Sequence, residues 1–134
     1  MLLPHGTVIA LVDGKHLELY RNGGNEAEPT FAALPAPMLD DHNHSGASHH
    51  SSAGNHDGHM VIEDAHAGAA VAWLNNEVLS HRIEHLVVVA APRTLGEMRK
   101  HYHKQLERVL LCELHKDLIG KAPAAILTAL REKK

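Results

Sequence analysis

The chain has 134 residues, of which 44% are hydrophobic, and this composition excludes a globally disordered protein and predicts one domain with a buried core. Only one residue is a cysteine, Cys112, which excludes an internal disulfide framework. No apolar run reaches the length of a membrane span, and the first residues lack the basic start of a signal peptide, so we expect a cytoplasmic protein with a net charge of −3.

The first third of the sequence predicts a meander of three β-strands. The three segments are residues 7–12, 15–21 and 30–34. The first is a continuous apolar run, typical of a strand that is buried on both faces. Asp13-Gly14 follows it and indicates a type I′ hairpin. The third segment is expected at an edge of the sheet, because Pro35 follows it and cannot donate to a strand ladder.

The apolar pattern disappears between residues 40 and 60, where histidine, serine, glycine, asparagine and aspartate dominate. This composition predicts a flexible, histidine-rich loop at about residues 40–60. Order is expected to resume at Asp64, whose residue type favours a helix N-terminus. Five apolar residues then follow at helical spacing on one face: Ala67, Ala70, Val71, Leu74 and Val78.

Residues 86–91 form the second unbroken apolar run and predict a central strand that is buried on both faces. Pro92 ends this strand, and Thr94 and Glu97 have the spacing of a capping box. A helix is therefore expected to leave the carboxyl edge of the sheet, which is where open α/β sheets tend to bind ligands.

The segment from residue 107 to residue 118 fits two structures. Apolar residues alternate as in a strand, but leucines also recur every fourth residue as in a helix, so the residues alone leave both open. Pro123 suits the first turn of a last helix, with Ile126, Leu127 and Leu130 facing inward. The order of elements predicts an α/β domain with a mixed sheet.

Several short segments together carry a resemblance to a known family. They are residues 3–7, Asp13-Gly14, Arg21-Asn22, residues 91–99, His103-Lys104 and residues 116–118. These segments resemble the bacterial host-attachment protein family (protein required for attachment to host cells), which is similar to the middle domain of archaeal and eukaryotic peptide-release factors and Pelota. The resemblance implies a single domain over residues 1–134 with a ribonuclease-H-like fold, a five-stranded mixed sheet with helices on its faces. It also implies that residues 109–114 are a strand parallel to the central one.

The segment before the first predicted helix departs from this family. Release factors carry Gly-Gly-Gln there, which presents a water molecule to peptidyl-tRNA, whereas this segment is histidine-rich and the only glutamine of the chain is Gln105. The resemblance therefore implies a non-catalytic, release-factor-like binding module of the translation apparatus. The partners that it implies are the ribosome, tRNA or rRNA.

Two sets of residues are candidate binding sites. The first is a set of six histidines in the predicted loop: His42, His44, His49, His50, His56 and His59. Imidazole suits zinc and nickel, so transition-metal binding is the alternative function, while the composition itself favours a solvated, mobile loop that binds no metal.

The second set lies in the basic half of the chain, because residues 1–67 have a net charge of −7 and residues 68–134 a net charge of +4. The residues predicted to contact phosphate or RNA are Arg93, Thr94, Arg99, Lys100 and Lys104. The alternative is a solvated helix face in which Glu97 and Glu107 pair with these cations.

No catalytic centre is predicted. A two-metal nuclease needs several converging carboxylates, whereas Asp13 lies in a hairpin turn and no acidic residue in residues 86–91 could meet Glu113 or Asp117. Cys112 lies within an apolar run and is interpreted as a packing residue.

Overall fold

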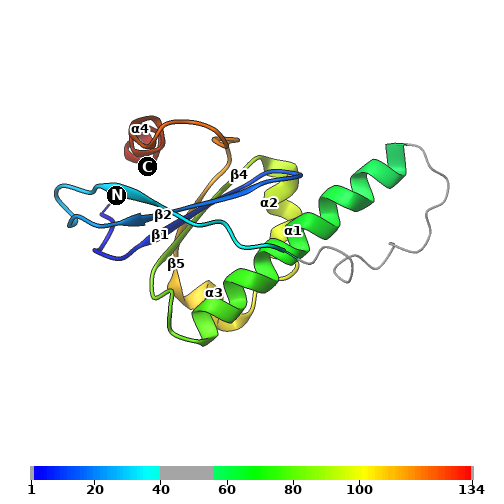
Figure 1. Cartoon of the computed structure of the whole chain (residues 1–134), viewed down its shortest axis with the longest axis horizontal. Helices are drawn as coiled ribbons and strands as arrows, with labels where there is room; N and C mark the ends of the chain where they lie inside the picture. The colour runs from blue at the N-terminus through cyan, green and yellow to red at the C-terminus, as the bar shows by residue number, and fades with distance from the viewer. Residues whose placement is uncertain (1, 40–55, 134) are drawn as a thin grey trace.

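The computed structural model describes residues 2–39 and 56–133, and it describes the side chains of residues 2–39 and 61–133. The elements in chain order are β1 (Val8–Val12), β2 (Leu17–Asn22), β3 (Phe31–Leu34), α1 (His56–Leu79), β4 (Leu86–Ala90), α2 (Pro92–Arg99), α3 (Lys104–Val109), β5 (Leu110–Leu114) and α4 (Pro123–Glu132). They form one sheet with helices on both of its faces (Figure 1).

The sheet has five strands in the order β3-β2-β1-β4-β5. β1 pairs antiparallel with β2 and parallel with β4, and β4 pairs parallel with β5. Every residue of β1 and β4 is at most 1% exposed, as their unbroken apolar runs predicted. β3 lies at one edge, also as predicted, and β5 lies at the other. The α/β class and the mixed five-stranded sheet are thus confirmed.

Two apolar clusters fill the space between the sheet and the helices. α1, α2 and α3 cover one face, and all five residues of the predicted apolar stripe of α1 are buried there. α4 covers the other face with Ile126 and Leu130, both at most 1% exposed. Figure 1 shows α4 on the opposite side of the sheet from α1 and α3. Leu127, expected to face inward, is only partly buried.

The predicted start of the first helix is wrong. α1 begins at His56, so Asp64 lies inside the helix and does not cap it. Residues 59–63 contain neither proline nor glycine, so nothing in them stops the helix from extending beyond Asp64 toward the N-terminus. His56 and His59 therefore lie in a helix, and the rest of the predicted loop, residues 40–55, lies outside the described residues.

The capping box predicted after β4 is also wrong. The helix α2 begins with Pro92, so Ala91 is its N-cap, and the methyl side chain of Ala91 has no oxygen to make a capping bond. Proline suits this position, since its fixed φ angle fits a helix and its missing N–H would have no partner there. Thr94 thus lies within the first turn, and Glu97 bonds Lys100 and His101 instead.

The turn after β1 is a hairpin, but not of type I′. That turn requires positive φ at both central residues, and within the described part of the chain only Gly6, His81 and Gly120 have positive φ. Asp13 instead accepts hydrogen bonds at Oδ1 from the backbone N–H groups of Lys15 and His16. Its side chain therefore stabilises the turn, as aspartate commonly does at such positions.

The ambiguous segment contains both a helix and a strand. α3 buries Leu106 against the core and ends at Val109, and β5 starts at the next residue. β5 runs parallel to β4, as the family resemblance implied. Within the described residues, no helix combines the length and the hydropathy needed to cross a membrane.

Candidate functional site

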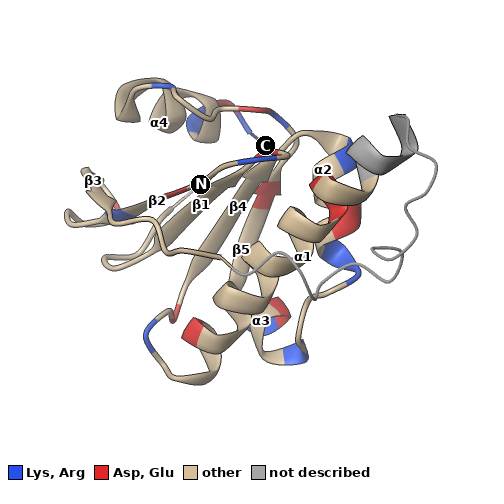
Figure 2. Ribbon diagram, turned by 45° about the vertical axis from the view of Figure 1, so that its right-hand side comes forward, with Lys and Arg blue, Asp and Glu red and all other residues tan. Residues whose placement is uncertain are grey.

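The carboxyl ends of three parallel strands meet at one edge of the sheet. Asp13 follows β1, Ala91 and Arg93 follow β4, and His115 follows β5. Helices α1 and α2 pack beside this edge, and acidic and basic residues are intermixed around them (Figure 2). This edge is the place where the sequence predicted a ligand site.

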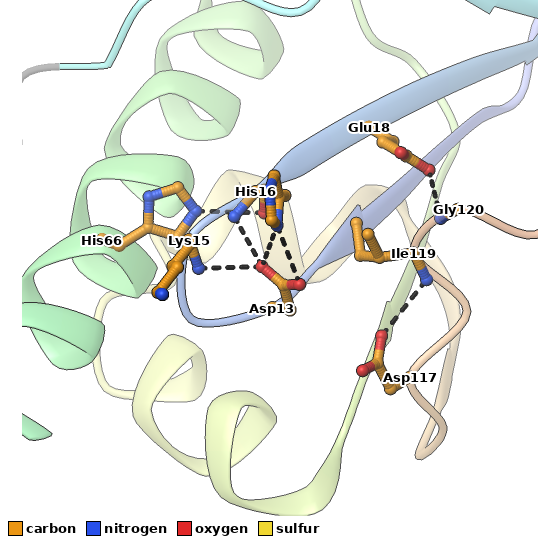
Figure 3. Close-up of polar contacts among 8 residues, drawn as sticks. All are labelled: Asp13, Lys15, His16, Glu18, His66, Asp117, Ile119 and Gly120. Carbon is orange, nitrogen blue, oxygen red and sulfur yellow. Dashed lines mark hydrogen bonds and ion pairs between the residues drawn. The ribbon is translucent and has the colours of Figure 1, made fainter.

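The Asp13 carboxylate is held by the hairpin that it starts (Figure 3). It accepts from the Lys15 backbone N–H at 2.8 Å and lies 3.0 Å from His16 Nδ1. Burial alone raises the pKa of Asp13, but these hydrogen bonds outweigh it and leave the pKa below its ordinary value. His66 of α1 lies 3.0 Å from the His16 carbonyl oxygen through Nε2, which joins α1 to the hairpin.

Arg93 lies between two carboxylates of α1. Its Nη2 is 3.1 Å from Asp64 Oδ1, and its Nη1 is 3.6 Å from Glu63 Oε1. The Glu63 side chain also lies against Gly14, where an added Cβ would approach it to 2.8 Å. The hairpin, α1 and the start of α2 therefore meet around Glu63, and the Arg93 side chain, 44% exposed, is ion-paired.

Arg99, the last residue of α2, also forms an ion pair. It donates to Glu113 of β5 from Nε at 3.0 Å and from Nη2, while Tyr102 donates its hydroxyl to the other oxygen of Glu113 at 2.7 Å. Burial raises the pKa of Glu113, but the hydrogen bonds from Arg99 and Tyr102 outweigh it, so the pKa lies below its ordinary value. The pKa of Tyr102 is raised, first by burial and then by the bond to Glu113.

The remaining predicted phosphate-binding residues differ in their partners. Lys100 binds Glu97 at 3.0 Å, and the pairing with Glu97 considered from the sequence is thus found in the structure. Thr94 is half-buried in the first turn of α2. Lys104, the first residue of α3, is exposed and has no carboxylate oxygen within 4 Å of its amine among the described residues. The structure therefore spreads the five residues over the side of the sheet that carries α2 and α3, and it ion-pairs three of them.

The predicted metal ligands fall largely outside the described residues: His42, His44, His49 and His50. His56 and His59 lie at the start of α1. Within the described residues, no group of three or more histidine, cysteine, aspartate or glutamate side chains is arranged to hold a metal ion. Cys112 is half-buried, and burial raises the pKa of its thiol, which agrees with a packing role.

Sequence reasoning missed the bond between Tyr102 and Glu113, which joins the end of the α2 region to β5. A signal for it was present, because a carboxylate in the middle of an apolar strand needs a polar partner when it is buried. It also missed that Glu63 and Asp64 pair with Arg93, since the helix was expected to start only at Asp64.

Comparison with known proteins identifies the family. The sequence model of bacterial archaeo-eukaryotic release factor family 12 matches residues 6–130. The chain belongs to this family. The relationship to release factors expected from the short segments is thereby confirmed, and it extends over nearly the whole sequence. A search of the curated proteins found no match.

Membership of release factor family 12 agrees with the described architecture, because one sheet and its helices occupy the matched residues. The match also includes the histidine-rich segment and the edge that carries Asp13 and Arg93. The more specific resemblance to the host-attachment protein family stays a prediction.

Proposed function

We propose that this family 12 protein is a non-catalytic, release-factor-like module that associates with the ribosome, tRNA or rRNA in the cytoplasm. The observation that carries the proposal is the family match over residues 6–130. The positive net charge of residues 68–134, +4, supports it, because phosphate contacts supply most of the affinity of proteins for RNA.

The phosphate contacts that we propose come from Arg93, Thr94, Arg99, Lys100 and Lys104. Lys104 can bind a phosphate without breaking an ion pair, since it has no carboxylate partner among the described residues. The cations of Arg93, Arg99 and Lys100 are 44%, 49% and 70% exposed and ion-paired. Exposed ion pairs are worth only about 0–1 kcal/mol each. A polyanion that meets several cations together can therefore exchange with their carboxylates.

We propose no peptidyl-tRNA hydrolysis by this chain. A release factor needs the glutamine of Gly-Gly-Gln, and the only glutamine here is Gln105, on α3, which follows Lys104 instead of two glycines. The backbone N–H of Gln105 donates to Nδ1 of His103, the N-cap of the same helix, at 3.0 Å. Gln105 thus belongs to a helix start and not to an exposed glycine-rich loop.

We further infer that the fold is of the ribonuclease-H-like type. Support comes from a strand order in which an antiparallel meander, β3-β2-β1, continues into the parallel strands β4 and β5. This fold does not by itself imply nuclease activity. The acidic residues at the carboxyl edge have other partners, since Asp13 holds the hairpin and Glu63 and Asp64 hold Arg93.

Co-sedimentation with ribosomes at moderate salt tests the proposal. We expect the wild-type protein in the ribosomal pellet and expect the Lys104→Glu variant to lose several-fold in affinity. Lys121→Glu is the matched control, because Lys121 is also an exposed, unpaired lysine of the described chain but lies beyond β5. Wild-type protein that stays wholly in the supernatant, or equal losses for both variants, would contradict the proposal.

Transition-metal binding remains the alternative function, and the six closely spaced histidines of residues 42–59 motivate it. Calorimetric titration of zinc or nickel into the wild type and into a variant without residues 40–55 tests it. We expect binding to depend on the deleted segment. Equal binding by both proteins would exclude this segment as the site.

A further inference from the structure

A pocket of about 270 Å³ lies at the end of the sheet opposite to Arg93. It is formed where β1 and β4 begin and where β2 ends, so three separate segments meet around it. The residues that line it are His5, Gly6, Arg21, Arg82, Glu84 and His85. Two arginines and two histidines therefore line one small space.

Arg21 differs from Arg93 and Arg99 in its partners. Its Nη2 donates to the carbonyl oxygen of Arg82 at 3.2 Å. Among the described residues, no carboxylate oxygen lies within 4 Å of its guanidinium nitrogens. A guanidinium has five N–H donors in a fixed fork, so most of the donors of Arg21 are left for a ligand.

His5 has one ring nitrogen in use and one without a partner in the described part of the chain. Nδ1 lies 2.7 Å from the carbonyl oxygen of Gly24. Because a carbonyl oxygen only accepts, Nδ1 carries a proton and donates it. Nε2 is the remaining nitrogen, and it donates to an anion in the pocket only when the ring is an imidazolium.

Buried polar contacts fix the backbone that carries these side chains. Asn22 is fully buried, and its Nδ2 donates to the carbonyl oxygen of Leu3 at 2.9 Å, while its Oδ1 accepts from Gly24 and Thr30. The backbone N–H of Gly6 donates to the Asn22 carbonyl oxygen at 2.8 Å, and Gly6 has a φ of +86°, which favours glycine. The loop before β1 is thus held rigidly against the end of β2, so the pocket is preorganised.

We propose that this pocket binds a phosphate group. Arginine forks are typical phosphate donors, and protonated imidazoles also donate to phosphate. Donors that come from three segments around one space suit a tetrahedral anion, which presents oxygens in several directions. No phenylalanine, tyrosine or tryptophan lines the pocket. The phosphate itself is what it recognises, whether it is free, in a nucleotide or in an RNA backbone.

Two acidic residues define the charge balance of this site. Arg82 is paired with Glu77 at 2.8 Å and brings little net charge, while Glu84 lines the pocket and repels an anion. Arg21 is thus the cation on which binding depends, and Glu84 is the group whose removal strengthens it. This proposal is independent of the proposed association with the ribosome.

An NMR titration with inorganic phosphate at constant ionic strength, with chloride as the balancing anion, tests the site. We expect saturable shifts at the amides of Gly6, Glu84 and His85. Arg21→Ala weakens binding about tenfold or more, as expected for a lost charged hydrogen bond. Arg131→Ala is the matched control, because Arg131 is an exposed, unpaired arginine of the described chain on α4, and it leaves the affinity unchanged.

Glu84→Gln provides a gain-of-binding test that a misfolded variant cannot imitate, and we expect it to tighten phosphate binding several-fold. Adenosine 5′-monophosphate and a short single-stranded RNA, added as competitors, show which source of phosphate the pocket prefers. Shifts that do not saturate, or equal losses for Arg21→Ala and Arg131→Ala, would overturn the proposal. Weaker binding by Glu84→Gln would also overturn it.

Discussion

The two ends of the sheet both carry arginines, but among the described residues they differ in whether carboxylates pair with them. At the carboxyl edge, Arg93 lies between Asp64 and Glu63, at 3.1 Å and 3.6 Å. At the amino edge, Arg21 contacts only a backbone carbonyl oxygen among its described neighbours. The two arginines therefore have similar places in the fold and different capacities to bind an anion.

This difference indicates that the ion pairs of an arginine, more than its position in the sheet, decide whether it can bind an anion. The carboxyl edge is where ligands of α/β sheets are expected, yet its polar groups largely satisfy one another. The amino edge instead combines a rigid polar scaffold with an arginine that has no carboxylate partner in the described part of the chain. A single phosphate has little to gain by displacing two carboxylates from Arg93, whereas Arg21 loses no ion pair when it binds.

The largest expected effect comes from breaking the scaffold of the amino end. Asn22→Ala removes the side chain that bonds Leu3, Gly24 and Thr30, so one buried and two part-buried backbone groups lose this partner. We expect a loss of about 3 kcal/mol in the free energy of unfolding, because each unsatisfied buried group costs about 1–3 kcal/mol. Urea denaturation measures it.

Asn76→Ala is the matched control for this prediction. Asn76 is exposed on α1, and its side chain has no hydrogen-bond partner in the described part of the chain, so we expect a change within about 0.5 kcal/mol. Similar losses for both variants would show that the Asn22 contacts do not stabilise the loop before β1.

At the carboxyl side, Tyr102→Phe removes the hydroxyl that donates to Glu113 at 2.7 Å. We expect a loss of about 1–2 kcal/mol, since hydrogen bonds to charged groups are stronger than neutral ones. Tyr20→Phe serves as control, because the Tyr20 hydroxyl has no partner in the described residues and should be dispensable. Thermal unfolding of both variants decides whether this bond matters.

The same contact predicts a dependence on pH. The pKa of Glu113 is lower in the folded protein than its ordinary value of 4.5, so the ionised carboxylate stabilises the fold at neutral pH. This contribution is lost as the pH falls below about 4.5 and through the folded-state pKa. We therefore expect Glu113→Gln to lower stability at pH 7, and we expect its difference from the wild type to shrink as the pH falls below about 4.5, as denaturation at neutral and acidic pH measures. A constant difference at both pH values would contradict the assignment.

His81 offers a smaller test of the amino end, because it precedes the segment that supplies Arg82 and His85. α1 ends in a Schellman motif, with Arg82 N–H bonded to the Glu77 carbonyl oxygen and His81 at a φ of +63°. His81→Gly relieves this left-handed conformation, and we expect a gain of about 0.5–1 kcal/mol. Chemical denaturation would contradict the expectation if the variant were less stable.

The smallest expected effect concerns the paired cation at the carboxyl edge. Asp64→Asn removes the closer carboxylate from Arg93, so we expect affinity for RNA to rise about two- to fivefold, in line with the value of an exposed ion pair. Fluorescence anisotropy with a labelled RNA measures it. Glu132→Gln, a change of the same charge on α4, is the control and should have no such effect.

The framework of the fold could be predicted from the sequence, because β1 and β4 are unbroken apolar runs and the inner face of α1 has helical spacing. The start of α1 could not be predicted, because an aspartate such as Asp64 can cap a helix or lie within one. The prediction of β5 depended on the family resemblance, because α3 and β5 follow each other directly within one apolar segment.

The candidate site was harder to predict. The basic residues near α2 were found, but their ion pairs depend on side chains of α1 and β5 that only tertiary packing brings close, such as Asp64 and Glu113. The amino-end pocket gave no local signal, because Arg21 and His85 are far apart in the sequence. The pairing of β1 with β4 brings their segments together.

The most direct test of the difference between the two ends is to observe the arginine Nε–H signals by NMR during a titration with inorganic phosphate. We expect the signal of Arg21 to shift and saturate, while those of Arg93 and Arg99 stay in place because carboxylates already hold them. Shifts of Arg93 and Arg99 with no change at Arg21 would contradict this account.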